Sequence, residues 1–249
     1  MGKKSKRRAA DDDWEAASSS RTSEKPPVHV SLPPTCRPIL PPGGASSKEA
    51  AVSGLVTAVA TLLEDGEGDA MLLAAPIMTA RECRAWIEWG EAIGFTIEKH
   101  AQTAYIAHRD NGRLAVESDE VAAAIFERLR PWLPAEVGGR KLRGCNPNIR
   151  LYRYAQGQRF GRHVDQANRL SGARGVTEAT VLLYLNDEGL EGGETLFYSH
   201  HAAPEPLMRV APKAGAALVH AHGARCLTHE GSEVRRGVKY LLRTDVAYA

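Results

Sequence analysis

Three side chains of the kinds that bind metal ions are spaced as one ferrous ion would need them. His163 and Asp165 are separated by a single residue, and His229 follows far downstream. Two neutral imidazoles and one carboxylate can occupy three coordination positions of Fe(II) and leave three open for a cosubstrate and O₂. Lys239 follows ten residues after His229 and would supply a counter-charge for the far end of a dicarboxylic cosubstrate. These residues therefore predict a mononuclear iron site.

The local geometry of the first two ligands depends on a strand. If residues 160–165 are extended, His163 and Asp165 point to one face, and Arg162 and Val164 point to the other. A third ligand from a distant strand would then complete a site on one face of the metal. The His-x-Asp pattern alone is weak because surface loops contain it by chance, so its interpretation depends on the surrounding segments.

Short strands are predicted for the second half of the chain. Apolar and polar residues alternate over residues 149–154, which is typical of a half-buried strand. Further apolar runs, split by Gly, Pro and Asn, predict strands at 180–185, 194–198, 216–220 and 238–246.

Helices are predicted before these strands. Residues 50–63 are rich in Ala, Val and Leu and are expected to form a helix, and residues 71–77 a short strand. Thr79 and Glu82 have the spacing of a capping box, which predicts a helix from there to about residue 92. Another helix is predicted over residues 118–129. Helices followed by many strands predict an α+β domain whose β part is a sandwich or barrel.

Residues 1–48 are predicted to form a disordered tail. A basic cluster at residues 3–8 precedes acidic and serine runs and a proline-rich stretch. This composition buries too little apolar area to offset the entropy of ordering. The basic cluster is a nuclear import signal, a weak nucleic-acid contact or a solvated part of the tail. Residues 49–249 are assigned to one domain, with its β core at about 146–249.

Composition narrows the class of protein. The net charge of +2 shows no bias toward nucleic acid or membrane. No apolar run approaches the ~18 residues of a membrane-spanning helix, and no apolar stretch follows the basic N-terminus as in a secretory signal. The cysteines lie far apart and are interpreted as reduced thiols: Cys36, Cys83, Cys145 and Cys226. A cytoplasmic or nuclear location is expected, and the sequence predicts no oligomeric state.

Four segments, in this order along the chain, carry a resemblance to a known family. They are residues 152–165, 180–186, 192–197 and 229–246. They resemble the 2-oxoglutarate- and Fe(II)-dependent dioxygenases of the prolyl 4-hydroxylase-like superfamily. The resemblance implies a double-stranded β-helix (jelly-roll) core with supporting helices packed on one side. It also implies Fe(II) bound by His163, Asp165 and His229.

The same resemblance implies a pocket for 2-oxoglutarate. Lys239 matches the position that pairs with the far carboxylate of the cosubstrate, and Tyr154 matches a tyrosine that hydrogen-bonds it. Other positions match residues that line the pocket: Leu182, Tyr184 and Thr195. Plain core packing is the alternative role for Tyr184 and Thr195. O₂ is the second substrate, and ascorbate is expected to support activity.

Two assignments have competitors in the sequence. His220 and His222 compete with His229 as the distal ligand, but only His229 is followed by the family's Gly-then-Lys pattern. Arg243, four residues after Lys239 and on the same face of a regular strand, is the second candidate for the far carboxylate.

The implied reaction is hydroxylation of a C–H bond with release of succinate and CO₂. The Lys239 spacing and the Gly-Gly-Glu-Thr segment at 192–195 favour a prolyl residue of a protein or peptide, as in procollagen-proline 4-dioxygenases. A nucleic-acid demethylase of the same superfamily is the first alternative, although Lys239 replaces the arginine-rich pattern of those enzymes. A non-catalytic binding module is the second, and the intact triad argues against it. No membrane partner is expected.

Overall fold

The structure is a computed structural model of the 249-residue chain. It describes residues 37–42, 77–97, 99–101, 103 and 107–249 in full, and the backbone of four strands before residue 75. The helices are α1 (Ala80–Ile93) and α2 (Asp119–Leu129), with short 3₁₀ turns at Arg130–Trp132, Gly172–Arg174 and Gly223–Arg225. The strands are β1 (Ser23–Glu24), β2 (Val28–Ser31), β3 (Thr57–Glu64), β4 (Ala70–Ala74), β5 (Thr96–Ile97), β6 (Gly112–Glu117), β7 (Glu136–Val137), β8 (Arg140–Cys145), β9 (Asn148–Tyr154), β10 (Phe160–His163), β11 (Val176–Tyr184), β12 (Glu191–Gly192), β13 (Thr195–Tyr198), β14 (Met208–Val210), β15 (Ala217–Ala221), β16 (Thr228–Gly231), β17 (Val234–Arg236) and β18 (Lys239–Tyr248).

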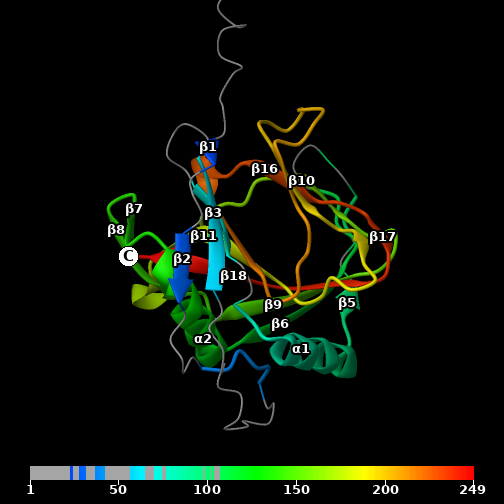
Figure 1. The fold of residues 1–249 in the computed structure, drawn as a ribbon, viewed down its shortest axis with the longest axis horizontal. Helices are drawn as coiled ribbons and strands as arrows, with labels where there is room; N and C mark the ends of the chain where they lie inside the picture. The colour runs from blue at the N-terminus through cyan, green and yellow to red at the C-terminus, as the bar shows by residue number, and fades with distance from the viewer. Residues whose placement is uncertain are drawn as a thin grey trace, which may run out of the picture.

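Two antiparallel sheets form the core. The large sheet has the order β1-β3-β4-β15-β11-β18-β9-β6-β5, and the small sheet has the order β10-β16-β13-β14. Both helices lie on the side of the large sheet away from β10 and β16 (Figure 1). The predicted jelly-roll core with helices packed on one side is therefore confirmed. The strands predicted after residue 148 are present as β9, β11, β13, β15 and β18, and β4 covers most of the strand predicted before α1.

Strand β9 shows how one strand serves both faces of the large sheet. Its side chains alternate between the two faces. Ile149 and Leu151 pack with Trp86 of α1 in the core beneath the sheet. Tyr152 and Tyr154 face the other way, into a second core between the two sheets. The alternation therefore places tyrosines inside the jelly roll.

Both helices begin where the capping residues predict. The Thr79 hydroxyl accepts from the backbone N–H of Glu82 at 3.2 Å, and the Glu82 carboxylate accepts from the backbone N–H of Thr79 at 2.7 Å. This reciprocal pair is the predicted capping box. At α2, the Ser118 hydroxyl accepts from the N–H of Val121 at 3.2 Å. Within the described part of the chain, no helix has the length and apolar character needed to cross a membrane.

The helix predicted over residues 50–63 is wrong where the structure describes it. Residues 57–64 are strand β3, which pairs with β2 and β4. The prediction rested on Ala and Leu, which occur in buried strands as well as in helices. Thr57 and Val59 lie in the same segment, and β-branched residues favour a strand once neighbouring strands are available for pairing. Residues 50–56 lie outside the described residues.

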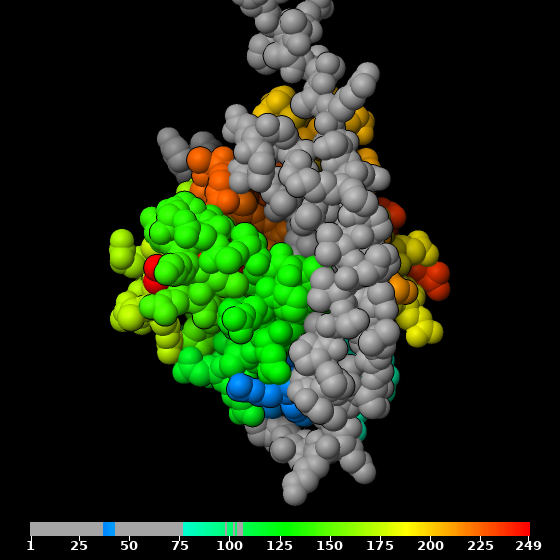
Figure 2. Space-filling view, turned by 60° about the vertical axis from the view of Figure 1, so that its left-hand side comes forward, coloured from blue at the N-terminus to red at the C-terminus, as the bar shows by residue number. Residues whose placement is uncertain are grey.

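Part of the predicted N-terminal tail packs on the domain. Ile39 is fully buried, its N–H donates to the Glu82 carboxylate at 2.8 Å, and its carbonyl accepts from the Trp86 indole N–H at 3.1 Å. Figure 2 shows the blue residues 37–42 lying against the green part of the surface. The predicted disorder therefore does not extend through this segment. Most of the rest of residues 1–48 lies outside the described residues, and the domain boundary stays a prediction.

A buried ion pair holds this segment. Arg128 of α2 pairs with Glu82 of α1 at 2.7 Å, and both side chains are almost fully buried. Arg128 also donates to the backbone carbonyls of Ile77 and Arg37, each at 2.6 Å. One guanidinium thus connects both helices to the segment before them.

Candidate metal centre

The three predicted metal ligands meet at one edge of the small sheet. Strands β10 and β16 pair with His163 opposite His229, and Asp165 lies two residues beyond the end of β10. Nε2 of His163 is 3.8 Å from Oδ1 of Asp165, and Nε2 of His229 is 3.7 Å from Oδ2. Metal–ligand bonds of about 2.1 Å place neighbouring donor atoms roughly 3–4 Å apart, so little movement is needed to hold one ion. The donor set and its geometry fit a mononuclear metal.

The backbone orients both imidazoles. Nδ1 of His163 lies 2.8 Å from the carbonyl of Gly161, and Nδ1 of His229 lies 3.0 Å from the carbonyl of Leu227. A carbonyl can only accept, so Nδ1 carries the proton and the lone pair is on Nε2. Both lone pairs then lie on the side of Asp165, as metal ligation requires.

The protonation states also suit a metal. Burial, with His229 nearby, lowers the pKa of His163 to about 3. Burial likewise lowers the pKa of His229. Burial alone would raise the pKa of Asp165, but Arg243 and the surrounding histidines together bring it well below its ordinary value. At neutral pH the imidazoles are neutral and the carboxylate is ionised, so no ligand must lose a proton when metal binds.

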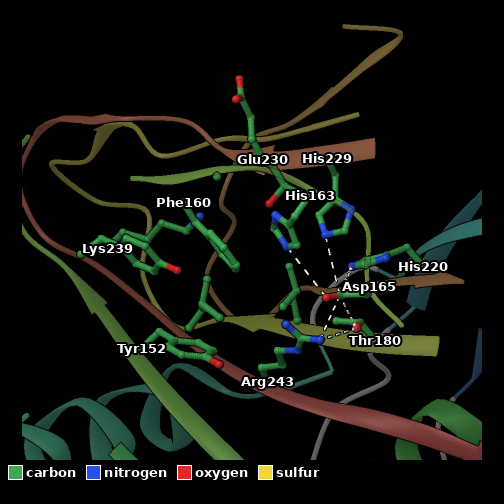
Figure 3. A pocket seen from close by; sticks show the side chains of 15 residues that line it. Tyr152, Phe160, His163, Asp165, Thr180, His220, His229, Glu230, Lys239 and Arg243 are labelled. Atoms are coloured by element: carbon green, nitrogen blue, oxygen red, sulfur yellow. Dashed lines mark hydrogen bonds and ion pairs between the residues drawn. The ribbon is translucent and has the colours of Figure 1, made fainter. Parts of the chain in front are cut away.

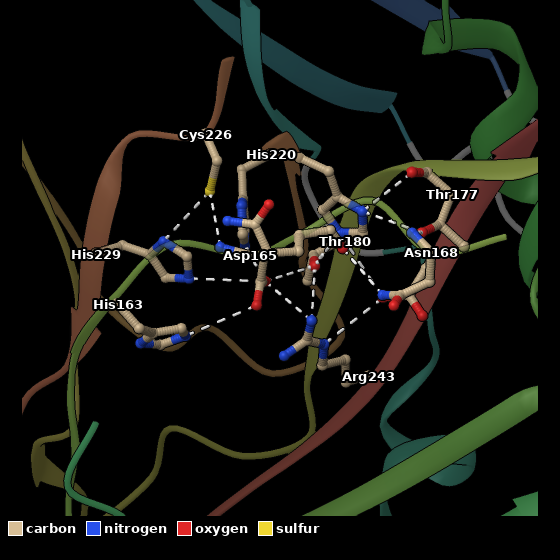
Figure 4. Close-up of polar contacts among 12 residues, drawn as sticks. His163, Asp165, Asn168, Thr177, Thr180, His220, Cys226, His229 and Arg243 are labelled. Carbon is tan, nitrogen blue, oxygen red and sulfur yellow. Dashed lines mark hydrogen bonds and ion pairs between the residues drawn. The ribbon is translucent and has the colours of Figure 1, made fainter. Parts of the chain in front are cut away.

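The Asp165 carboxylate is held from the large sheet. Thr180 of β11 donates to Oδ2 at 2.7 Å, and Arg243 of β18 pairs with the same oxygen at 2.9 Å (Figure 4). Asp245 lies 3.7 Å from Nε of Arg243 and pairs with Arg150 at 2.5 Å. Two donors on Oδ2 fix the orientation of the carboxylate and leave Oδ1 on the side of His163.

Arg162 and Val164, which alternate with the ligands along the chain, point away from the site, as predicted. Arg162 donates to the carbonyls of His201 and Ala203 at 2.8 and 2.7 Å, and its guanidinium lies 3.7 Å from the ring centroid of Tyr198. Val164 is 43% exposed. The alternation expected of an extended segment therefore separates the ligands from the surface.

A pocket extends from the triad between the two sheets (Figure 3). It encloses about 420 Å³, counted to its open mouth. Its lining comes from both sheets: Tyr152, Tyr154, Phe160, His163, Asp165, Thr180, Leu182, Thr195, His220, His229, Glu230, Gly231, Lys239, Leu241 and Arg243. The triad and Lys239 lie toward opposite sides of this space in Figure 3. A small molecule could therefore touch the metal with one end and Lys239 with the other.

Lys239 is a buried cation with few partners. Its side chain is only 3% exposed, and Nζ donates to the carbonyl of Gly193 at 2.5 Å. Nζ also lies 5.5 Å from the ring centroids of Tyr154 and Tyr184. Burial lowers the pKa of Lys239 to about 8, and no carboxylate among the described residues lies within 4.0 Å of Nζ. Burying an unpaired ammonium is unfavourable, so this position favours an anionic ligand.

The predicted cosubstrate residues line the same pocket, with one exception. Those that line the pocket with Lys239 are Tyr154, Leu182, Thr195 and Arg243. Tyr184 is not part of the lining; its hydroxyl lies 2.7 Å from the Thr195 hydroxyl and supports that residue. Their contacts with a cosubstrate stay a prediction.

The competing histidines have different surroundings. His222 is turned toward Thr180, with Nε2 2.7 Å from the hydroxyl. His220 stays near the site, with Nε2 3.8 Å from Oδ2 of Asp165. Among the described residues, His229 alone of the three has donor atoms grouped with those of both His163 and Asp165.

Two further side chains that can bind metal lie beside the triad. His220 lies opposite Thr180 in the pairing of β15 with β11, and its ring centroid is 4.4 Å from that of His229. Sγ of Cys226 lies 3.8 Å from Nδ1 of His229. The sequence marked His220 as an alternative distal ligand, and strand register places it beside His229. Cys226 was missed, although it lies three residues before a ligand.

Comparison with known proteins assigns the segment that carries the site. Residues 149–244 match the family model described as the 2OG-Fe(II) oxygenase superfamily. This segment is similar to 2OG-Fe(II) oxygenase domains. It includes all three predicted ligands, Lys239 and Arg243. No curated protein sequence matches the chain.

Solved structures share the fold of this domain. The viral collagen prolyl hydroxylase of Paramecium Bursaria Chlorella virus-1, in its 2OG complex, is 20% identical with a TM-score of 0.53, over 74% of this chain and 98% of that one. A Trichoplax adhaerens prolyl hydroxylase, in complex with a hypoxia inducible factor peptide fragment, is 16% identical with a TM-score of 0.53, over 71% of this chain and 83% of that one. At these identities the likeness establishes the fold.

Proposed function

We propose that this protein is an Fe(II)- and 2-oxoglutarate-dependent dioxygenase that hydroxylates a prolyl residue of a protein or peptide, with release of succinate and CO₂. One observation carries the cosubstrate assignment. Lys239 is a buried cation without a carboxylate partner within 4.0 Å among the described residues, and it faces the triad across one pocket. A dicarboxylate with a neighbouring oxo group has the charges to fill both ends.

The protein's own residues bind and orient the reactants. Bound iron, with 2-oxoglutarate and O₂, supplies the oxidation of the C–H bond. His163, Asp165 and His229 would hold this iron, and Lys239 would bind the far carboxylate. Burial raises the pKa of Tyr154, so its hydroxyl stays protonated and can donate to that carboxylate. The aromatic and apolar lining keeps bulk water from the reacting atoms.

Lys239 is a better partner for the far carboxylate than Arg243. Arg243 is already paired with Asp165 at 2.9 Å and lies 3.7 Å from Asp245. Its charge is therefore paired within the protein, whereas no carboxylate of the described residues lies within 4.0 Å of the Lys239 ammonium. In this proposal Arg243 holds the metal-binding carboxylate and Lys239 binds the cosubstrate.

The prolyl substrate rests on weaker support. Two proteins with the same fold are described as prolyl hydroxylases, and one of them was solved with a peptide. A nucleic-acid substrate gains no support from the structure. A location in the cytoplasm or nucleus, and stimulation by ascorbate, complete the proposal. The unpaired thiols of Cys83, Cys145 and Cys226 support such a location.

Succinate formation tests the proposal. Purified protein is incubated with Fe(II), ascorbate and 2-oxoglutarate, with proline-containing peptide pools or alkylated oligonucleotides. We expect succinate to rise with peptides alone and the peptide to gain one oxygen atom. His229→Ala should abolish turnover, whereas His200→Ala, at an exposed histidine outside the pocket, should retain it. Full activity of His229→Ala, or stimulation only by oligonucleotides, would overturn the proposal.

A further inference from the structure

A second group of metal-binding side chains shares His229 with the triad. The donor atoms of His220, Cys226 and His229 lie within 4.8 Å of one another. Sγ of Cys226 is 3.8 Å from Nδ1 of His229, the ring nitrogen that faces away from Asp165. A tetrahedral ion with bonds of about 2.3 Å to sulfur and about 2.0 Å to nitrogen holds these two atoms roughly 3.5 Å apart. The observed distance is close to this value.

His220 gives an independent indication of a ligand. Its side chain is buried, at 2% exposure, and neither ring nitrogen has a hydrogen-bond partner among the described residues. The aromatic rings of Phe197 and His229 pack against it. A neutral imidazole has one donor and one acceptor, and leaving both unpaired in the interior is unfavourable. A metal bound through one nitrogen would satisfy the acceptor.

We propose that His220, Cys226 and His229 form a second metal site, specific for a soft ion such as Zn²⁺, Cd²⁺ or Cu⁺, which excludes iron from the first. Thiolate and imidazole ligands select such ions, whereas ions that prefer oxygen ligands, such as Mg²⁺ and Mn²⁺, bind thiolates poorly. This inference rests on the proposed function in one respect, namely that the ion excluded from the first site is iron.

The exclusion follows from the two nitrogens of His229. Iron needs the lone pair on Nε2 and the proton on Nδ1, where the Leu227 carbonyl accepts it at 3.0 Å. The soft ion needs the lone pair on Nδ1, so the proton moves to Nε2, which lies 3.7 Å from Oδ2 of Asp165. One neutral imidazole cannot satisfy both arrangements. Occupation of the second site therefore removes a ligand from the first.

Burial raises the pKa of the Cys226 thiol to about 11, so the bound ion itself must stabilise the thiolate. When the ion binds, the thiol proton passes to water, and no electrons are transferred. The backbone N–H of Asp165 already donates to Sγ at 3.2 Å, and a thiolate accepts this bond better than a thiol does. The same hydrogen bond links the second site to the first.

Cadmium titration of the iron-free protein tests the site directly, because a cadmium–thiolate bond absorbs in the ultraviolet. All variants are made on Cys36→Ser, since Cys36 lies outside the described residues. We expect a band that saturates at one equivalent and persists in His163→Ala. Cys226→Ser should lose it, and His220→Gln should bind cadmium at least about tenfold more weakly. Cys145→Ser is the matched control and should keep it.

Competition for iron provides the second measurement. Retained Fe(II), measured after desalting, should fall with one equivalent of cadmium in the parent protein and much less in Cys226→Ser. Thermal unfolding of each variant verifies that it is folded. A band that persists in Cys226→Ser, or disappears in His163→Ala, would overturn the proposal. The absorption band needs no turnover, so a protein that makes no succinate but shows the band would contradict only the proposed function.

Discussion

Two buried cations on β18, Lys239 and Arg243, have opposite electrostatic surroundings. Arg243 lies 2.9 Å from the Asp165 carboxylate, and this pairing, against the effect of burial, raises its pKa. Lys239 contacts the carbonyl of Gly193 and two tyrosine rings, and burial lowers its pKa although the more distant Glu194 carboxylate partly opposes this. At the scale of residues the two cations are therefore expected to have separate roles. Loss of Lys239 should lower the affinity for 2-oxoglutarate, and loss of Arg243 should lower the affinity for metal.

Binding of 2-oxoglutarate is expected to weaken above about pH 8. Burial lowers the pKa of Lys239 to about 8, and only the ammonium form pairs with a carboxylate. Below this pKa the affinity should be constant; above it, each pH unit should lower the affinity by up to about tenfold. Calorimetric titration of Mn²⁺-loaded protein from pH 7 to about 9.5 measures this. Lys239→Met should bind weakly at every pH, and an equally flat profile in the unchanged protein would contradict the prediction.

Arg243→Gln is expected to lower metal affinity by about 10–100-fold, because it removes a donor that orients a ligating carboxylate. Lys239→Met serves as the control and should keep its metal affinity, since Lys239 does not touch the triad. Metal dissociation constants from Mn²⁺ titration followed by electron paramagnetic resonance compare the two. If Arg243→Gln instead lost only 2-oxoglutarate affinity, Arg243 would be the carboxylate partner.

Residue spacing together with the family resemblance predicted the triad but not its surroundings. His163 and Asp165 are neighbours on one segment, and His229 is marked by the lysine that follows it. The contact of Arg243 with Asp165 depends on which residues of the two sheets face each other. This packing cannot be predicted from the types of the two residues. The proximity of His220 depends on strand register in the same way.

At the scale of elements, the turn between β12 and β13 positions Lys239. Gly193 has φ +71°, which favours glycine, and its carbonyl accepts the hydrogen bond from Nζ. A Cβ added at Gly193 would lie 3.0 Å from Cδ of Lys239 and 3.3 Å from Val234. The turn therefore both anchors the lysine and limits the space around it.

Gly193→Ala is expected to lower 2-oxoglutarate affinity by at least about tenfold. Gly189→Ala is a matched control: its φ of +68° carries similar backbone strain, but an added Cβ meets nothing within 4 Å. Both should lose stability by about 1–2 kcal/mol, the usual magnitude for a left-handed residue with a side chain. Calorimetry with 2-oxoglutarate and urea unfolding separate the two effects. Equal loss of affinity in both variants would show that strain alone is responsible.

The prediction of a helix succeeded where the sequence itself contains a capping pair. The capping box predicted α1 because Thr79 and Glu82 satisfy each other locally, without help from the rest of the fold. Residues 57–64 had no such local signal, and the pairing of β3 with β2 and β4 determined their conformation. Local capping can be read from a sequence, whereas strand pairing depends on partners elsewhere in the chain.

At the scale of the whole molecule, the folded domain includes a segment that its amino-acid composition predicts to be a disordered tail. Residues 37–42 lie in a proline-rich stretch, yet Ile39 is fully buried beside Trp86. A composition average over 48 residues hides one apolar side chain that fills a specific site. The carbonyl of Arg37, which accepts from buried Arg128, was equally invisible in the sequence.

Ile39→Ala is expected to lower the free energy of unfolding by about 2–5 kcal/mol, the range for truncating a buried isoleucine. Ile97→Ala, at a residue that is 50% exposed, should change it by less than about 0.5 kcal/mol. Urea denaturation followed by tryptophan fluorescence measures both. Equal stability of the two variants would place residues 37–42 outside the cooperative unit.

The carbonyls of Gly161 and Leu227 affect which residues of this protein can be substituted without loss of the metal ligands. Each holds the Nδ1 proton of the histidine two residues later, and each belongs to the main chain. No side-chain substitution at positions 161 or 227 deletes these acceptors. The walls and mouth of the pocket can therefore diversify, in evolution or in the laboratory, toward new substrates while the same imidazole nitrogens remain presented to the metal.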